Sequence, residues 1–292
     1  MRSSRETIIL KVIAFTALIA LALSAILPMM IVISASVTGE EALKLYGFSI
    51  LPRDFTLQAY KLVMGGTRIL TMYRNTIIVT FLGTIGSVVI QTCAAYVLSR
   101  NDYKWRTVIS YMFYFTLLFS GGAIASYIWL SSYLHMRNTF AVLIVPGMFS
   151  ASNVFMLRAY LSKIPSAVIE SAKIDGANEF VILSRLIVPM GITGIATITI
   201  MTALGYWNEW YKCLMFITDD NKMTLQYYLN SMMSSIDAII KNQNSGLTDL
   251  REMPSESARM AVCVLGAGPM VFIFMFFQKY FVKGLTIGSV KG

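Results

Sequence analysis

The sequence predicts an all-α integral membrane protein with six transmembrane helices, and three observations lead to that prediction. Of the 292 residues, 56% are hydrophobic and 13% are charged, a balance that a water-soluble domain of this length could hardly bury. Six stretches without Asp, Glu, Lys or Arg approach or exceed the ~20 residues that span hydrocarbon as a helix. Positive charge is also distributed unequally between the connecting segments.

The six apolar stretches form one transmembrane domain that covers residues 1–292. The expected spans, three of which extend one or two residues beyond the uncharged stretch, are residues 12–36, 75–99, 107–134, 138–158, 186–210 and 259–280. Arg2, Arg5 and Lys11 precede the first span, as basic residues precede the apolar region of a secretory signal peptide. That stretch is long for a signal and has no small-x-small cleavage pattern, so we expect a retained helix.

Basic residues assign the two sides of the membrane. The N-terminus and residues 99–107, 158–186 and 279–292 carry 13 Lys and Arg in 63 residues, against 11 in 98 residues on the other side. The first set also holds 5 acidic residues against 10. The positive-inside rule therefore predicts that both termini are cytoplasmic. The net charge of +9 is then explained by basic residues that orient the chain in the membrane. No basic stripe with interleaved aromatics indicates a nucleic-acid partner.

Metal-binding and catalytic clusters are not predicted. Cys93, Cys213 and Cys263 lie in or beside expected spans without metal-ligand spacing, and His135 has no second His or Cys nearby. We expect no metal site and no catalytic residue in this chain.

The connection between the fourth and fifth spans differs from the other expected cytoplasmic connections, which are short. In residues 162–186, named here the elbow, Pro165 suits a first helical turn that Ser162 or Ser166 could cap. Gly176 fits the left-handed residue that ends this helix, and Asn178 fits the cap of a second short helix. We expect a helix–turn–helix on the inner face.

The elbow has two interpretations. An amphipathic helix could rest on lipid headgroups, or small residues at 171, 172, 176 and 177 could allow another protein to approach closely. An interfacial helix has no need for Glu170, Asp175 and Glu179 beside an anionic leaflet, which favours a protein partner.

The elbow also resembles a known family. Glu170-Ser171-Ala172 is followed after three residues by Gly176, and after nine more by Leu186-Ile187-Val188-Pro189. This pattern is similar to the E-A-A, Gly, Ile-x-Leu-Pro signature of bacterial ABC importer permeases, from which Ser171, Leu186 and Val188 depart conservatively. The resemblance implies the type I ABC importer permease fold, with a coupling helix that docks into a cytoplasmic ATPase. The coupling residues that it implies are Glu170, Ser171, Ala172, Asp175, Gly176, Ala177 and Pro189.

Two further segments resemble carbohydrate permeases. Residues 281–292 are similar to the tail of permeases related to the second maltose permease, and the resemblance implies that Lys283, Gly284 and Lys291 reach towards the ATPase. The Tyr206-Trp207-Asn208-Glu209-Trp210 run resembles permeases of lipo-oligosaccharide and aldouronate importers.

The implied assembly is a heterodimer with a second homologous permease, a dimer of cytoplasmic ATPase subunits and an extracellular substrate-binding protein. The implied cargo is an oligosaccharide, and the implied location is the bacterial plasma membrane. The chain has no G-x-x-x-x-G-K-[ST] loop, so we expect it to bind no cofactor, with ATP and Mg²⁺ held by the partner ATPase. The elbow would then act as a lever that tilts the fourth and fifth spans.

Sugar contacts would come from uncharged polar and aromatic groups, since sugars offer hydroxyl groups and apolar ring faces. The candidates are Gln91, Tyr96, Tyr127, Asn153, Tyr206, Trp207, Asn208 and Glu209. Aromatic anchoring at the interface or hydrogen bonding between helices is the favoured explanation for each of them apart from Asn208 and Glu209. Asn208 and Glu209 stand out, because a carboxylate just beyond the uncharged stretch that ends at Asn208 suits a wet cavity mouth.

Two expected outer segments are candidates for contact with the binding protein. The connection at residues 217–258 is long and contains an apparent helix at about 223–240. The other, residues 37–74, contains a Pro52-Arg53-Asp54 turn and an ordered segment at 57–64.

The leading interpretation is the permease subunit of an ATP-driven importer of a complex oligosaccharide. The alternative is a self-contained secondary transporter or channel for a small polar solute, which would need intramembrane carboxylates or an inverted repeat. The six uncharged stretches supply no such carboxylate, and no His, Cys and carboxylate cluster indicates a membrane enzyme.

Overall fold

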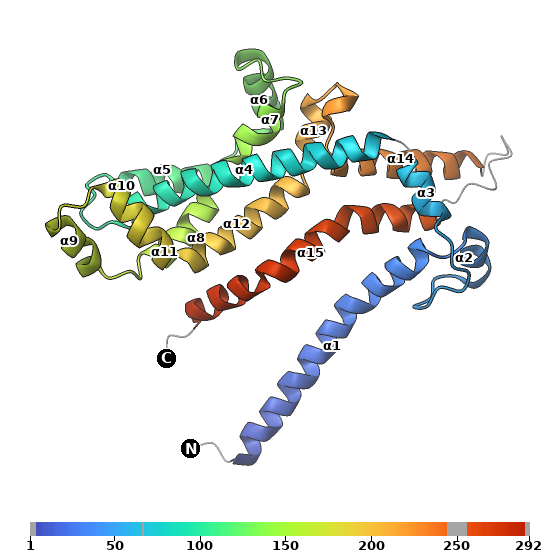
Figure 1. The fold of residues 1–292 in the computed structure, drawn as a ribbon, viewed down its shortest axis with the longest axis horizontal. Helices are drawn as coiled ribbons and strands as arrows, with labels where there is room; N and C mark the ends of the chain where they lie inside the picture. Colours follow the sequence, from blue (N-terminus) through green and yellow to red (C-terminus); the bar gives the residue numbers. More distant parts are fainter. Residues whose placement is uncertain (1–3, 66, 244–255, 290–292) are drawn as a thin grey trace. The chain divides into compact units, whose positions relative to one another are not determined.

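The computed structural model describes residues 4–65, 67–243 and 256–289, with side chains described at 7–65, 68–235 and 256–275. Helices dominate the described residues, and no strand occurs among them apart from an isolated antiparallel bridge between Thr38 and Phe55 (Figure 1). The chain divides into two units, residues 1–67 with 229–268 and residues 68–228 with 269–292. Each unit is described by itself.

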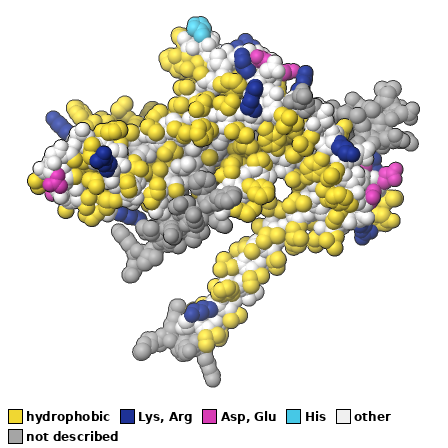
Figure 2. All heavy atoms as spheres, viewed as in Figure 1, with side chains coloured by type: hydrophobic (Ala, Val, Ile, Leu, Met, Phe, Trp, Pro, Cys, Tyr) yellow, Lys and Arg dark blue, Asp and Glu magenta, His cyan; other side chains and the backbone are white. Residues whose placement is uncertain are grey.

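The first unit begins with α1 (Ser4–Ser36), which is apolar on all sides. The stretch Thr7–Ser36 is long and apolar enough to cross a membrane, and its most hydrophobic window contains no buried residue. Figure 2 shows hydrophobic side chains along its length. A helix that is hydrophobic all round suits lipid or a partner protein rather than water, in agreement with the first expected span.

The connection after α1 is compact. It contains α2 (Glu40–Tyr46) and α3 (Gln58–Met64), and the Gly39 N–H donates to the Asp54 carbonyl over 2.9 Å. The Glu40 carboxylate accepts from the N–H groups of Glu256 and Ser257 at the start of α15 (Glu256–Ser289). A negative charge at a helix N-terminus satisfies unpaired donors and complements the helix dipole.

The second unit is organised along α4 (Thr67–Ser99), a straight apolar helix that begins earlier than the expected boundary at residue 75. The remaining helices of the chain, in order, are α5 (Arg106–Leu118), α6 (Gly122–Ile128), α7 (Phe140–Ile144), α8 (Ala151–Leu161), α9 (Ser166–Ile174), α10 (Glu179–Val181), α11 (Val188–Met190), α12 (Ile192–Trp207), α13 (Tyr211–Phe216) and α14 (Leu225–Gln243). Shorter π or 3₁₀ turns are η1 (Trp129–Tyr133), η2 (Val145–Gly147), η3 (Ile182–Ile187) and η4 (Asp220–Lys222).

Three of the expected spans are bent helix pairs. Residues 106–133 bend by 111°, residues 140–161 by 45° and residues 179–207 by 83°. Gly122 with φ of +79° lies at the first bend, Pro146 lies in η2 at the second, and Gly191 lies at the third. The described residues thus hold three helices suited to crossing a membrane, or six if each bent pair is one span.

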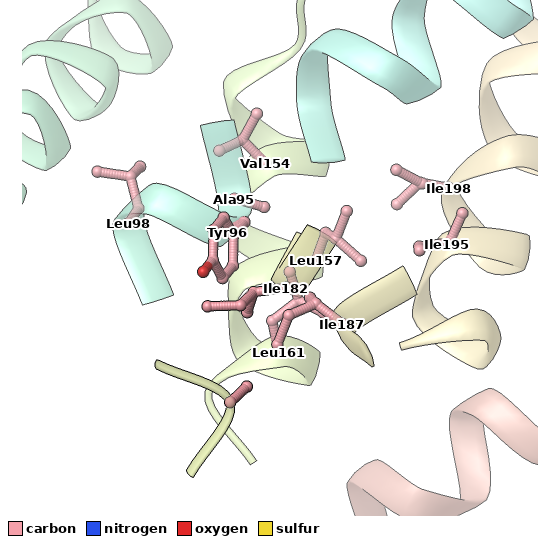
Figure 3. Close-up of a cluster of buried hydrophobic side chains, with 11 residues drawn as sticks. Ala95, Tyr96, Leu98, Val154, Leu157, Leu161, Ile182, Ile187, Ile195 and Ile198 are labelled. Atoms are coloured by element: carbon pink, nitrogen blue, oxygen red, sulfur yellow. The ribbon is translucent and has the colours of Figure 1, made fainter. Parts of the chain in front are cut away.

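Two apolar clusters hold the second unit together. The first joins the C-terminal part of α4 to α8, η3 and α12 through Leu98, Leu157, Ile182, Ile187 and Ile198 (Figure 3). The second surrounds Tyr206 and includes Val79, Leu143 and Phe216. In Figure 2, charged side chains of this unit gather near α9 and near α13, and the surface between them is largely hydrophobic. This distribution is typical of a protein that crosses a bilayer.

Candidate functional site

The turn of the elbow is built by α9 and the residues that end it. The Gly176 N–H donates to the Lys173 carbonyl over 3.0 Å, and the Ala177 N–H donates to the Ala172 carbonyl over 2.9 Å. Gly176 has φ of +81°. These two bonds and the left-handed glycine form a Schellman ending, so the expected turn at Gly176 is present.

The second helix of the elbow starts where the sequence predicted. The Asn178 Oδ1 atom accepts from the Val181 N–H over 2.9 Å, which caps α10. The expected serine cap of α9 is wrong: no side chain caps it, and Pro165 occupies the position before its first residue. Pro165 fits there because its backbone is extended and the following turn needs no N–H from it. Pro189 lies in α11, just before the bend at Gly191.

The two faces of α9 have different environments. Ala172 packs into the apolar cluster of Figure 3 and is 9% exposed. Glu170, Ser171, Asp175 and Gly176 are exposed, and Ala177 is half-buried. Ala172 and Ala177 therefore approach the protein's own helices, which leaves Ser171 and Gly176 as the small residues open to another surface.

Two large apolar side chains are also exposed on the elbow. Ile174 is 86% exposed and Phe180 is 76% exposed, on either side of the Gly176 turn. Exposed apolar groups rimmed by charged residues are typical of interaction surfaces. Sequence reasoning did not select them, although their position in a charged segment was a usable signal.

An ion-pair cluster fastens the elbow to the end of α4. The Arg100 Nη1 atom lies 3.2 Å from Glu179 Oε2, and the guanidinium also pairs with Asp102. The Lys173 Nζ atom lies 3.2 Å from carboxylate oxygens of both Asp102 and Glu179. The Tyr96 hydroxyl donates to Glu179 over 2.6 Å and accepts from Arg100 over 2.7 Å. We name these five residues the α4–elbow cluster.

The α4–elbow cluster shifts the protonation equilibria of its charged members. The hydrogen bond from Arg100 holds the pKa of Asp102 well below its ordinary value. The hydrogen bond from Tyr96, followed by that from Lys173 and by the positive charge of Arg100, lowers the pKa of Glu179. Hydrogen bonds to Glu179 and Asp102 raise the pKa of Lys173. Each charged form is thus stabilised by its partners.

Sequence reasoning placed Tyr96 among the candidate sugar contacts and counted residues 99–107 only as a short, basic cytoplasmic connection. The structure brings Tyr96 to the elbow instead, although 83 residues separate it from Glu179. Nothing local in the sequence indicates such a long-range contact.

A cavity of about 590 Å³ lies beneath the elbow. Its lining includes Arg100, Asp102, Lys163, Pro165, Glu170 and Lys173. It contains both charge signs, so it suits contact with a polar protein surface better than an apolar ligand. No group of three or more His, Cys, Asp or Glu that could bind a metal occurs within the described part of the chain.

Two pathway candidates fasten helices to the break between α7 and α8. The Gln91 Nε2 atom donates to the Met148 carbonyl over 3.1 Å, and the Tyr206 hydroxyl donates to the Ile144 carbonyl over 2.7 Å. Both side chains are buried. A Cβ on Gly83 would lie 2.5 Å from the Tyr206 ring, so the tyrosine depends on that glycine. The Gln91 Oε1 atom is buried without a hydrogen-bond partner.

The remaining pathway candidates are dispersed. Tyr127 stacks on Phe216 with ring centroids 5.3 Å apart, and Asn153 donates to Thr202 over 3.3 Å. Trp207 is 3% exposed, in the wall of an apolar pocket between α4, α12 and α15. These side chains do not converge on one site.

Asn208 and Glu209 lie at the end of α12. The Glu209 carboxylate accepts from the Lys212 backbone N–H over 2.8 Å and also pairs with its ammonium group. Asn208 is exposed and accepts from Gln226 over 3.4 Å. The nearby loop is held to α4, where Asn75 donates to the Asn221 and Met223 carbonyls. The Glu209 carboxylate is therefore paired with Lys212, whereas a carboxylate at a wet cavity mouth would not have required such a partner.

The tail candidates are only partly described. The backbone at Lys283 and Gly284 continues α15, while their side chains and Lys291 lie outside the described residues.

The fold and the elbow define an all-helical membrane protein with a charged connection between apolar segments. The chain belongs to the family of binding-protein-dependent transport system inner membrane components, whose model matches residues 6–287. It is 33% identical over 281 residues to the polygalacturonan/rhamnogalacturonan transport system permease protein YtcP of Bacillus subtilis, covering 94% of this chain and 96% of that protein. The trehalose/maltose transport system permease protein MalG of Thermococcus litoralis is 24% identical over 99% of each chain.

A solved structure supports the same conclusion. The chain matches the crystal structure of a bacterial ABC transporter involved in the import of the acidic polysaccharide alginate, with a TM-score of 0.82 and 26% identity, over 96% of this chain and 99% of that one. The prediction of an ABC importer permease is thus confirmed, and the chain is a membrane-embedded subunit of a transporter. A self-contained transporter or channel is not favoured.

Proposed function

We propose that this permease subunit moves a carbohydrate, specifically a complex oligosaccharide, from an extracellular binding protein into the cytoplasm by alternating access. Relatives named for pectin-type polymers and for maltose, and a structural neighbour for alginate, support this substrate class. Two of these three transport polymers of acidic sugars, which favours an oligosaccharide that contains uronic acid.

The elbow is the proposed receiver of motion from a cytoplasmic ATPase. The observation that carries this role is the outward surface formed by Glu170, Ser171 and Ile174, while Ala172 anchors the opposite face of the same helix. Because one face of α9 packs against the protein and the other is open, a docked ATPase could displace the helix without unfolding it. ATP and Mg²⁺ would be bound by the ATPase, with no cofactor on this chain.

The α4–elbow cluster would extend that motion beyond the adjoining helices. The elbow directly follows α8 and leads through η3 into α11, and the bonds from Arg100 connect it to α4 as well. A displacement of α9 would therefore move α4, α8 and the start of the fifth span together. Tilting three helices as one body would open a path at one side of the membrane and close it at the other.

The remaining assignments follow from the family and from charge asymmetry. We assign both termini to the cytoplasm, a second homologous permease to a heterodimer, and residues 217–258 to contact with the binding protein. Lys283, Gly284 and Lys291 are assigned to contact with the ATPase. Asn208 and Glu209 remain the proposed substrate contacts, since Asn208 is exposed.

Co-purification tests the coupling role. Glu170→Lys, expressed with the second permease and the ATPase, should lose most of the bound ATPase because it reverses an exposed charge at the proposed contact. Glu41→Lys reverses an exposed glutamate on α2 and should retain the ATPase. Equal ATPase recovery in both variants would refute the docking assignment.

Substrate-stimulated ATP hydrolysis in the reconstituted importer tests the cargo. Oligogalacturonides and oligo-alginate should stimulate hydrolysis more than malto-oligosaccharides of equal length, when supplied with the binding protein. Asn208→Ala should raise the half-stimulating sugar concentration. Stimulation by neutral sugars alone would reject the uronic-acid assignment, and unchanged values in Asn208→Ala would remove that residue from the pathway.

A further inference from the structure

A groove of about 460 Å³ lies between α5 and α8, outside the elbow cavity. Its lining consists of Arg106, Thr107, Ser110, Tyr111, Tyr114, Phe155, Arg158, Ala159 and Ser162. The set combines two guanidinium groups, hydroxyl groups and aromatic rings, and it contains no carboxylate. We name it the arginine groove.

The two arginines of the arginine groove lack acidic partners. Neither α5 nor α8 contains an Asp or a Glu, and no ion pair of Arg106 or Arg158 is found among the described side chains. Arg158 donates to the Ser110 hydroxyl over 3.0 Å, and Arg106 donates to Asn101. Each guanidinium carries five N–H donors, so most of this hydrogen-bonding capacity is left for a ligand. Both arginines are half-buried, where an uncompensated charge is costly.

The surroundings place the groove at the level of lipid headgroups. Trp105 is 56% exposed, Tyr111 72% and Tyr114 56%, and such amphipathic rings gather at the boundary between hydrocarbon and water. Farther along α5, Phe115 and Leu118 are exposed apolar residues that suit acyl chains. The groove thus offers positive charge at one end of an apolar surface.

We propose that the arginine groove binds the headgroup of an anionic phospholipid, with the phosphate held by Arg106 and Arg158 and the acyl chains along α5. Guanidinium groups bind phosphate oxygens in a bidentate manner. Basic pockets between transmembrane helices on the cytoplasmic side suit such headgroups. The assignment to the cytoplasmic leaflet rests on the proposed orientation of the chain, whereas the phosphate chemistry does not.

Lipid retention by the purified importer tests the proposal. The complex is stripped of lipid and titrated with phosphatidylglycerol or phosphatidylcholine, and bound lipids are counted by native mass spectrometry. The affinity for phosphatidylglycerol should fall about fivefold in Arg158→Gln and in Arg106→Gln, from a contribution of roughly 1 kcal/mol per basic residue. The affinity for phosphatidylcholine should be unchanged.

Matched variants separate the groove from general charge. Lys11→Gln removes one exposed positive charge from α1, on the same predicted side, and should leave the affinity within about twofold of the original. Ser110→Ala removes the hydrogen bond to Arg158 without removing charge, and should change retention less than Arg158→Gln. If Arg158→Gln fails to fold, Arg158→Lys, which keeps the charge and loses the planar fork, should give an intermediate affinity.

Any of four outcomes would overturn the proposal, and the first three concern the lipid titration. They are equal retention of the two lipids, equal loss in Lys11→Gln, and displacement of phosphatidylglycerol by millimolar inorganic phosphate, which would indicate a soluble anion. A groove covered by the partner permease would show no effect of the arginines in the assembled complex and would overturn it too. Lipid counting does not depend on sugar stimulation or on the elbow variant, so failure of the proposed function would be seen separately.

Discussion

At Gly176 the chain leaves α9 with φ of +81°, and no atom outside the turn lies within 4 Å of an added Cβ. A side chain there would meet no neighbour, so any penalty arises from the backbone. A residue with a Cβ in the left-handed region costs roughly 1–2 kcal/mol. Gly176→Val should therefore lower the free energy of unfolding by about that amount, measured by thermal unfolding in detergent, and should weaken ATPase recovery.

Gly268 provides the matched control for this prediction. It lies within α15, also has open space around an added Cβ and has no left-handed φ. Gly268→Val should change stability by less than about 0.5 kcal/mol, since the two residues differ little in a helix. Identical behaviour of the two variants would mean that the turn tolerates another backbone path.

Residue-level features were predictable where their cause is local. The Gly176 turn and the Asn178 cap depend on neighbours within five residues, and the sequence identified both. Tyr96 and Tyr206 could not be assigned in the same way, because their hydroxyl partners lie 83 and 62 residues away. A tyrosine near a span end is compatible with an interface anchor, a sugar contact or a buried hydrogen bond, and only the fold distinguishes them.

At the scale of elements, the α4–elbow cluster should contribute measurable stability. The Arg100 side chain is 11% exposed and bonds to Asp102, Glu179 and Tyr96. Removing a partly buried charge that hydrogen-bonds to charged groups costs about 1.5–3 kcal/mol. Arg100→Gln should lower stability accordingly and reduce the transport obtained per ATP hydrolysed, because α4 would no longer follow the elbow.

Arg68 is the control for Arg100. It pairs with Asp220 at 3.5 Å, with side chains 69% and 57% exposed, and exposed pairs contribute about 0–1 kcal/mol. Arg68→Gln should leave coupling intact. Transport per ATP that is equal in the two variants would show that α4 does not take part in the motion.

The pKa shifts within the α4–elbow cluster determine the pH range over which the cluster stabilises the folded protein. Asp102 and Glu179 have lowered pKa values, so their contribution is complete above their ordinary values near 4 and is lost as the pH falls through the lowered ones. Lys173 has a raised pKa, so its contribution is complete below its ordinary value near 10.5 and is lost at higher pH. The stabilisation should therefore be constant between about pH 5 and pH 9.

Thermal midpoints of the protein and of Glu179→Gln measured across pH test this window. The difference between them should be constant between about pH 5 and pH 9 and shrink at lower pH, as Glu179 becomes protonated in both states of the unmodified protein. A difference that instead grows on acidification would reverse the assigned sign. The matched substitution Glu41→Gln, at an exposed residue of α2, should show no such profile.

Element boundaries were predictable only in part. Counting uncharged residues predicted six apolar segments, yet it could not reveal that residues 106–133, 140–161 and 179–207 are bent. Gly122 directly follows the first break, Pro146 lies in the turn just before the second, and Gly191 lies at the third; all three are uncharged and do not interrupt hydropathy. Charge marks where a span ends, whereas backbone freedom at glycine and proline decides whether it is straight.

For the whole molecule, composition predicted a protein of the membrane and the motif of the elbow resembled ABC importer permeases, and the family match agrees with both. The spatial grouping of the candidate sugar contacts was not predictable, because an uncharged polar residue on an apolar helix can face a pathway or a neighbouring helix. Gln91 illustrates this: one amide atom bonds to Met148, and the other is buried without a partner.

The orientation of the whole chain can be tested by thiol labelling. After Cys93, Cys213 and Cys263 are replaced by Ser, a cysteine is introduced at Leu51 or at Ala167, both exposed. The positive-inside rule places Leu51 outside and Ala167 inside. A membrane-impermeant maleimide should therefore label Leu51→Cys in intact cells, and should label Ala167→Cys only in inverted vesicles prepared without the ATPase. Ile19→Cys, within α1, should remain unlabelled from both sides because thiolate does not form in hydrocarbon. The opposite pattern would invert the topology and place the elbow beyond the reach of a cytoplasmic ATPase, so this one measurement bears on orientation, coupling and the leaflet of the arginine groove together.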